Sequence, residues 1–192
     1  MRLKLPVLLG SMRRDRMGIR AARLVIRTLE ERGHDASLVD AMELQLPLLD
    51  RMYKEHPKGQ APENLEKLAA LYRAADGFII VSGEYNHGIQ PAMKNLLDHF
   101  LEEYFWRPSG IVCYSQGSFG GVRAAMQLRM TLAELGMSSV PSLMPIPSIQ
   151  NVLSEDGMPA HDWVAKSLAR FLNEFEWYAR ALKAERNKGV PR

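Results

Sequence analysis

The chain has 192 residues, of which 46% are hydrophobic and 24% charged, a balance typical of a globular protein with one domain-sized core. The net charge is only +3 and no basic face with interleaved aromatic residues is evident, so we expect no nucleic-acid partner. No apolar stretch approaches the ~20 residues of a membrane span, which predicts no membrane partner and, by default, a cytoplasmic protein. The single cysteine, Cys113, excludes an internal disulfide and a cysteine-built metal cluster, and we expect no metal site.

Five apolar runs with the length of strands alternate with segments of helical periodicity. The first run lies within residues 1–10, where Pro6 cannot donate a ladder hydrogen bond and leaves the beginning of the strand open. The other four strands are predicted at 36–39, 77–81, 110–114 and 140–144. Apolar residues at helical spacing predict helices over 19–29, 65–72, 93–105, 122–135 and 164–178.

This alternation of strands and helices predicts an α/β fold, in which helices cover both faces of a parallel sheet. We predict a single domain over residues 1–185 and a basic C-terminal tail over residues 186–192. Residues 45–62 form the longest irregular stretch, and long loops in compact domains are often functional.

The loop after the first strand, residues 10–18, carries the chemistry of a phosphate site. A hydroxyl at Ser11, guanidinium groups at Arg13, Arg14 and Arg16, and the backbone N–H groups of a helix N-terminus all favour a bound phosphate. The alternative is an ordinary solvated turn. The loop is neither a Walker A sequence nor a GxGxxG fingerprint.

Two further loops follow the third and fourth strands. In residues 82–88, Tyr85 offers an aromatic ring and Asn86 offers donor and acceptor atoms, although a turn whose Asn caps the next helix remains open. In residues 115–121, glycines would let a flat ligand lie against the backbone. In the flavodoxin-like strand order 2-1-3-4-5, the ends of strands one, three and four share one crevice. A phosphate at the first loop and a planar ring between the other two describe FMN.

The chain resembles the NAD(P)H-dependent FMN reductase family, which includes azoreductase-like and quinone-reductase-like flavoproteins. The likeness covers most of residues 3–150 and rests on ordered motifs: Gly10-Ser11-x-Arg13, Leu46-Pro47-Leu48-x-Asp50, Ala75-Asp76-Gly77, Glu84-Tyr85-Asn86, Pro91, Lys94-Asn95-x-x-Asp98 and Ser115-x-Gly117-x-x-Gly120-Gly121-x-Arg123-Ala124. The resemblance implies a flavodoxin-like three-layer sandwich with a five-stranded parallel sheet in the order 2-1-3-4-5. It also implies FMN, NADPH or NADH as hydride donor, and assembly as a homodimer or homotetramer.

Carried over by position, the resemblance implies cofactor contacts from each of the three loops. The phosphate would be bound by Ser11 and Arg13, with backbone from Arg16, Met17 and Gly18; the isoalloxazine and ribityl region by Glu84, Tyr85 and Asn86; and the other side of the ring by Ser115, Gly117 and Gly120. The family often has a hydroxyl or amide residue where Met17 stands, and a proline where Gly83 stands. Both departures would weaken FMN binding, the second by making the loop less rigid.

Because flavin and nicotinamide would carry the chemistry, we expect no catalytic side chain. The adjacent Asp98 and His99 diverge on a helix, so we interpret Asp98 as structural and His99 as a surface or interface residue. The sequence predicts a small-molecule electron acceptor such as a quinone, an azo compound or a flavin. Two alternatives remain: a flavodoxin-type electron carrier that serves a protein partner, and a hydrolase with Ser115 as nucleophile. The aromatic residues at 104–106 predict an exposed interface and therefore a homo-oligomer.

Overall fold

Five parallel strands form the central sheet of the computed structural model, which describes residues 1–191. They are β1 (Lys4–Leu9), β2 (Asp35–Asp40), β3 (Phe78–Ser82), β6 (Pro108–Tyr114) and β7 (Ser138–Ile146), in the order β2-β1-β3-β6-β7. With the strands of this sheet numbered along the chain, the order is 2-1-3-4-5. The predicted flavodoxin-like α/β fold is confirmed.

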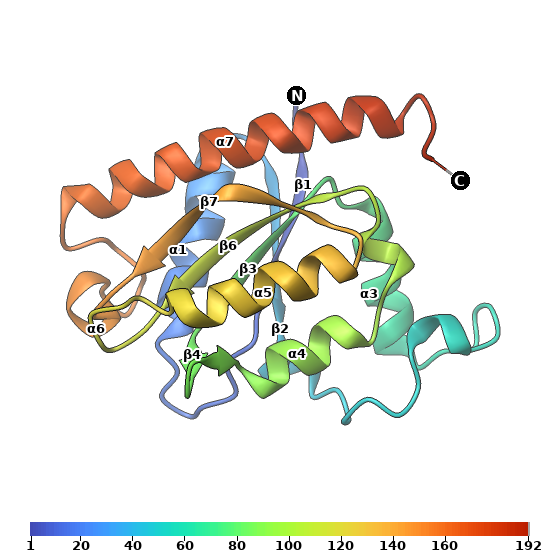
Figure 1. Cartoon of the computed structure of the whole chain (residues 1–192), viewed down its shortest axis with the longest axis horizontal. Coiled ribbons are helices and arrows are strands. Elements are labelled where there is room, and N and C mark those ends of the chain that lie inside the picture. The colour runs from blue at the N-terminus through green and yellow to red at the C-terminus, as the bar shows by residue number, and fades with distance from the viewer. Residues whose placement is uncertain (192) are drawn as a thin grey trace.

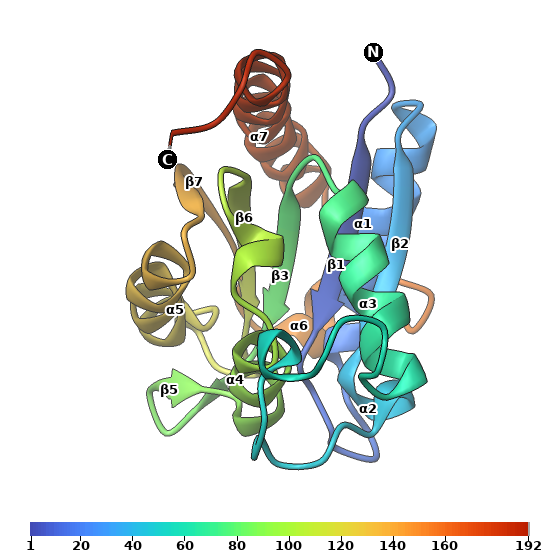
Figure 2. The ribbon, with the colours of Figure 1, turned by 90° about the vertical axis from the view of Figure 1, so that its right-hand side faces the viewer.

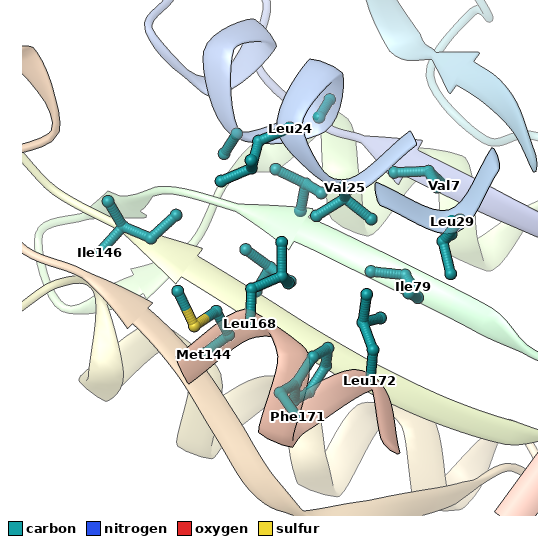
Figure 3. Packing of buried hydrophobic residues seen from close by; sticks show 14 of the residues in the cluster. Val7, Leu24, Val25, Leu29, Ile79, Met144, Ile146, Leu168, Phe171 and Leu172 are labelled. Atoms are coloured by element: carbon teal, nitrogen blue, oxygen red, sulfur yellow. The ribbon is translucent and has the colours of Figure 1, made fainter. Parts of the chain in front are cut away.

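Helices cover both faces of the sheet (Figure 1 and Figure 2). One face packs against α1 (Gly18–Glu31) and the long C-terminal helix α7 (Asp162–Arg186). Figure 3 shows this core, where Val25 and Leu29 of α1 and Leu168 and Leu172 of α7 gather over the strands. The other face packs against α3 (Glu63–Ala74), α4 (Pro91–Asp98) and α5 (Val122–Glu134). The sheet is therefore buried on both sides, as expected of a parallel sheet.

Short elements complete the chain. They are two helices, α2 (Ala41–Leu44) and α6 (Ile149–Val152), two 3-10 turns, η1 (Tyr53–Glu55) and η2 (Glu102–Tyr104), and a hairpin of β4 (Glu84–Tyr85) and β5 (Gly88–Ile89). Proline is accommodated at positions where the ladder does not need its N–H. The pairing of β1 with β3 begins at Val7, one residue after Pro6, and Pro141 and Pro145 lie in the edge strand β7.

The predicted aromatic interface at residues 104–106 is wrong. The helix ends at Asp98 rather than at residue 105, and the chain turns so that Tyr104 is fully buried. Its ring centroid lies 5.3 Å from that of Tyr72 and 5.2 Å from that of Phe78, within the core under α3. Only Trp106 is substantially exposed, at 44%. Because Tyr104 belongs to the core, the three residues form no exposed aromatic cluster and give no argument for a homo-oligomer.

The interpretation of His99 as a surface or interface residue is also wrong. His99 is 1% exposed, and its Nδ1 lies 2.8 Å from the carbonyl oxygen of Asn95. The segment 45–62 covers this position: the Tyr53 N–H donates to the His99 carbonyl oxygen at 2.8 Å, and His99 lines a hollow beneath that segment. Asp98 pairs with Lys94 on the same helix, which agrees with its structural interpretation.

The C-terminal helix is tied to the amino end of the sheet. Asp76, which precedes β3, accepts hydrogen bonds from Lys183 at 2.8 Å and from Arg186 at 3.4 Å. Arg186, the first residue of the predicted tail, is the last residue of α7. The boundary of the domain at residue 185 stays a prediction, and Arg192 of the tail lies outside the described residues. Within residues 1–191, no helix combines the length and apolar character that crossing a membrane requires.

Candidate functional site

Three loops at the carboxyl edge of the sheet surround a cavity of about 500 Å³. This volume lies within the range of about 300–1,000 Å³ that is usual for small-molecule sites. Eight of the eleven predicted site residues line the cavity: Ser11, Arg13, Arg16, Met17, Glu84, Tyr85, Ser115 and Gly117. The other three, Gly18, Asn86 and Gly120, belong to the same three loops but are not part of the cavity wall.

The first loop leads into the N-terminus of α1, which no side chain caps. Met17 occupies the N-cap position without a side-chain hydrogen bond, and the first turn contains no acidic residue. The first N–H groups of a helix have no partner within it, so this end of α1 presents donors and a partial positive charge. Ser11 is 2% exposed beside it, and Arg13 is exposed at the rim. Asp15 also lines the cavity and is the one carboxylate of this loop.

Arg16 has a different role from the one its charge suggested. Its guanidinium forms a two-pronged ion pair with Asp40, at the end of β2, and also donates to the carbonyl oxygen of Ser11 at 3.1 Å. Both charged side chains are nearly buried, with 11% and 5% exposure. Arg16 is therefore engaged within the protein, and its guanidinium fastens the first loop to the neighbouring strand rather than facing a phosphate.

The second loop is a small hairpin, which sequence reasoning missed. Asn86 and His87 both have positive φ angles, 50° and 65°, which is the conformation of a type I′ turn between β4 and β5. In this turn Asn86 is not part of the cavity wall. The N-cap position of α4 is occupied by Gln90 rather than by Asn86. Asn86 therefore serves the turn and caps no helix. The signal in the sequence was the Asn-His-Gly run, a favourable composition for such a turn.

Glu84 anchors this hairpin to α5. One oxygen of its carboxylate accepts hydrogen bonds from the backbone N–H groups of Arg123 and Ala124, at 3.0 and 3.2 Å, and Arg123 approaches the other at 3.7 Å. A carboxylate is well placed at a helix N-terminus, where it meets free N–H groups and the positive end of the dipole. The carboxylate of Glu84 therefore holds the wall of the cavity in place.

The third loop is held by hydrogen bonds to the backbone carbonyl oxygen of Gly117. The Ser115 hydroxyl donates to the carbonyl oxygen of Gly117 at 2.9 Å, and the same oxygen accepts from the Ser148 N–H at 3.0 Å. A Cβ atom added to Gly117 would meet nothing within 4 Å, so the wall is open to a ligand there. Gly120 has a different use: its φ of 62° forms the turn into α5, where a side chain would be strained.

Six cavity residues were not among the predicted site residues: Asp15, Gly83, Gln90, Tyr114, Gln116 and Ile149. Tyr114 ends β6 and is 7% exposed, and Gln90 is 2% exposed before α4. The sequence placed Tyr114 within an apolar strand and gave Gln90 no role. The hydroxyl of Tyr114 and the amide of Gln90 are buried against residues distant in the chain, and such contacts produce no recognisable pattern in the local sequence. Cys113, next to Tyr114, is fully buried, and burial raises the pKa of its thiol to about 12. It is therefore an unreactive core residue.

A second hollow of about 500 Å³ lies under the irregular segment 45–62. Asn95 of α4 holds this segment, accepting from the Leu49 N–H at 2.9 Å and donating to the Pro47 carbonyl oxygen at 2.8 Å. Of these two cavities in residues 1–191, the first joins the ends of β1, β3 and β6, where the strand order of the sheet reverses. In open α/β sheets that is the place where ligands bind.

Comparison with known proteins identifies the family. The model of the NADPH-dependent FMN reductases matches residues 3–150, which contain the three loops of the cavity. The chain belongs to this family. Membership confirms the predicted class, an oxidoreductase enzyme, and the predicted pair of cofactors, FMN and NAD(P)H. It leaves the assignment of individual site residues untested.

Two curated relatives match most of the chain. A quinone reductase from Pseudomonas putida is 27% identical over 187 residues, which cover 93% of this chain and 95% of that protein. An NADPH azoreductase from Bacillus sp. is 25% identical over 155 residues, which cover 79% and 85%. Among solved structures, the NAD(P)H:(acceptor) oxidoreductase FerB from Paracoccus denitrificans has a TM-score of 0.73 at 20% identity, and the match covers 93% and 98% of the two chains. That structural likeness shows the shared fold.

Proposed function

We propose that the cavity binds FMN, and that the protein takes hydride from NAD(P)H and passes electrons to a small acceptor. The observation that carries the proposal is the convergence of three strand-end loops on one cavity beside an uncapped helix N-terminus. The phosphate would lie on α1, against Ser11 and Arg13. The isoalloxazine would lie between the β4–β5 hairpin and the open wall at Gly117.

The residues present fit this cofactor. A phosphate needs N–H and O–H donors and positive charge, which the first turn of α1, Ser11 and Arg13 supply. A flat ring needs a wall without side chains and an aromatic neighbour, which Gly117 and the half-buried Tyr85 supply. Of the acidic residues on the wall, Glu84 is held by α5 and Asp15 is exposed to solvent, so neither places an unscreened buried charge against a phosphate.

The chemistry that FMN supplies when bound is acceptance of hydride from NAD(P)H and delivery of electrons to an acceptor. The protein's part is to bind and orient the reactants. Arg16 and Asp40 hold the phosphate loop, Glu84 holds the hairpin, and Ser115 holds the glycine loop in shape. Among the described residues, the cavity wall contains no histidine, and the Ser115 hydroxyl donates within its own loop. These features oppose the hydrolase alternative, which needs a base beside the nucleophile.

A quinone or an azo compound is the acceptor class that we favour, because relatives of similar length are named as a quinone reductase and an azoreductase. The discriminating alternative is an electron carrier that docks a protein partner. A carrier would bind FMN but would not oxidise NADPH steadily with a quinone present. A cytoplasmic location and assembly as a homodimer or homotetramer remain predictions.

Replacing Arg13 by Ala tests the phosphate site. A hydrogen bond to a charged group contributes about 1.5–3 kcal/mol, so FMN affinity should fall about 10- to 100-fold. Arg14→Ala is the matched control, because Arg14 is also an exposed arginine of the same loop but does not line the cavity. Titration of apoprotein with FMN, followed by quenching of flavin fluorescence, measures both affinities.

Three results would contradict the proposal. The purified protein, supplied with FMN, could fail to bind it; Arg13→Ala and Arg14→Ala could weaken binding equally; or the FMN-loaded protein could leave NADPH unoxidised with a quinone present. The first result rejects the cofactor site, the second rejects the role of Arg13, and the third favours the carrier.

A further inference from the structure

Tyr114 is wedged between two glycines that belong to different loops. A Cβ atom on Gly18, the first residue of α1, would lie 2.3 Å from the Tyr114 hydroxyl oxygen. On the other side, a Cβ atom on Gly83 would lie 3.0 Å from Cζ of the same ring. A Cβ atom essentially never lies within 3.0 Å of a non-bonded heavy atom, so the ring fits only because position 18 has no side chain, and position 83 leaves little room for one. The tyrosine and these glycines form one packed unit beneath the cavity.

A chain of hydrogen bonds sets the direction in which the Tyr114 hydroxyl can donate. The Gly83 N–H donates to Gln90 Oε1 at 3.0 Å, which orients the amide so that Gln90 Nε2 faces Tyr114. Nε2 then donates to the Tyr114 oxygen at 3.5 Å. A phenol has one proton and can accept two hydrogen bonds. Its oxygen accepts from Gln90, and its other side-chain partner is Ser11, a hydroxyl that can itself donate to the phenol oxygen. The phenol proton then points to the cavity side, where a ligand beside Ser11 can accept it.

The hydroxyl is also at the end of α1 where a donor is missing. Met17, at the N-cap position, has a thioether that cannot donate. The Tyr114 oxygen lies against Gly18, the next residue, and so shares the position of the helix's first N–H groups. Burial raises the pKa of the Tyr114 hydroxyl, with hydrogen bonds to Ser11 and Gln90 opposing the rise, so the phenol keeps its proton at neutral pH.

We propose that Tyr114 is a cofactor-binding residue whose hydroxyl donates a hydrogen bond to the phosphate of FMN, beside Ser11 and the N-terminus of α1. The Tyr114 hydroxyl thereby supplies a donor on the cavity wall that the side chain at position 17 does not provide. Gln90 is the positioning residue that leaves the phenol proton free for the ligand. This inference rests on the proposed placement of FMN and adds to it a residue from the end of β6.

The test compares Tyr114→Phe with the parent protein in binding FMN and riboflavin, which has the same ring system and ribityl chain but no phosphate. Phenylalanine keeps the ring between the two glycines, and thermal unfolding of the apoprotein checks that the variant is folded. Tyr178→Phe, a hydroxyl removal on α7 outside the cavity, is the control. We expect FMN affinity to fall about 10-fold or more in Tyr114→Phe and riboflavin affinity to change less than about twofold.

Stabilisation of the apoprotein by inorganic phosphate gives a second readout without flavin. Phosphate should raise the unfolding temperature of the parent and of Tyr178→Phe, and should raise that of Tyr114→Phe less. Unchanged FMN affinity in Tyr114→Phe would overturn the inference, as would equal losses for FMN and riboflavin. Tighter FMN binding in Tyr114→Phe would show that the hydroxyl occupies the place of the phosphate. If the parent binds neither flavin, the proposed function fails together with this inference.

Discussion

The ion pair between Arg16 and Asp40 should stabilise the protein far more than a surface pair does. Removing one partner of a buried pair costs about 3–5 kcal/mol, because it leaves an uncompensated buried charge. Arg16 and Asp40 are 11% and 5% exposed, so each single replacement should approach the lower end of that range. Asp40→Asn retains an acceptor for the Met42 N–H, which the Asp40 carboxylate binds at 3.0 Å, and Arg16→Met retains apolar volume.

The assay is a double-mutant cycle in urea. Unfolding of the apoprotein is measured for the parent, Arg16→Met, Asp40→Asn and the double variant, and the interaction energy should reach about 2–3 kcal/mol, the upper part of the range for residues in contact. The control cycle uses Lys94 and Asp98, whose side chains are 48% and 27% exposed. A helical pair of that kind contributes about 0.3–0.5 kcal/mol. Added salt should weaken the control pair more than the buried pair.

The Arg16 and Asp40 variants also test whether this ion pair maintains the conformation of the loop at residues 10–18. Arg16 donates to the Ser11 carbonyl oxygen at 3.1 Å, so loss of the pair should loosen the loop and lower FMN affinity as well as stability. An Arg16–Asp40 interaction energy no larger than that of Lys94–Asp98 would refute the reasoning. So would an Arg16→Met variant that binds FMN as tightly as the parent, because the loop would then keep its shape unaided.

Two further predictions concern a glycine of the cavity and a carboxylate of α7. Gly117→Ala should stabilise the apoprotein by about 0.4–1 kcal/mol, since alanine restricts the unfolded chain and meets no atom within 4 Å here, yet it should weaken FMN binding. Thermal unfolding and flavin titration measure the two effects, and unchanged FMN affinity would place the ring away from this wall. Burial alone would raise the pKa of Glu176, but Arg32, with His34 and Arg180, holds it below its ordinary value. A depressed folded-state pKa adds stability above the unfolded-state pKa, which is lost as pH falls through the folded value. Glu176→Gln should therefore be less stable than the parent at neutral pH and should show a flatter loss of stability in acid, as urea unfolding between pH 7 and pH 3 would reveal. Glu185→Gln, which changes an exposed residue of the same helix, is the control. If the free energy of unfolding fell equally with decreasing pH in Glu176→Gln and in the parent, the expected linkage would be contradicted.

The amino-acid sequence was sufficient for the order of strands and helices, because hydrophobic periodicity is a local property of the chain. Glycines mark the helix ends at Gly33 and Gly136, whose φ angles are 82° and 76°, for an equally local reason. From that order follow the parallel sheet and the convergence of three loops at its carboxyl edge. The sequence by itself was therefore enough to place Ser11, Tyr85 and Gly117 around one cavity.

Tertiary structure alone decided what the polar side chains do. Arg16 meets Asp40, which lies 24 residues away, and Glu84 meets α5 some 40 residues later. Tyr114 became part of the cavity because two distant loops leave room for it at Gly18 and Gly83. Tyr104 enters the core because α4 ends at Asp98, and His99 is buried because the segment 45–62 packs over it. Each outcome depends on how elements that are distant in the sequence pack against one another. The residues around a charged or aromatic side chain in the sequence do not indicate which distant residue it will contact.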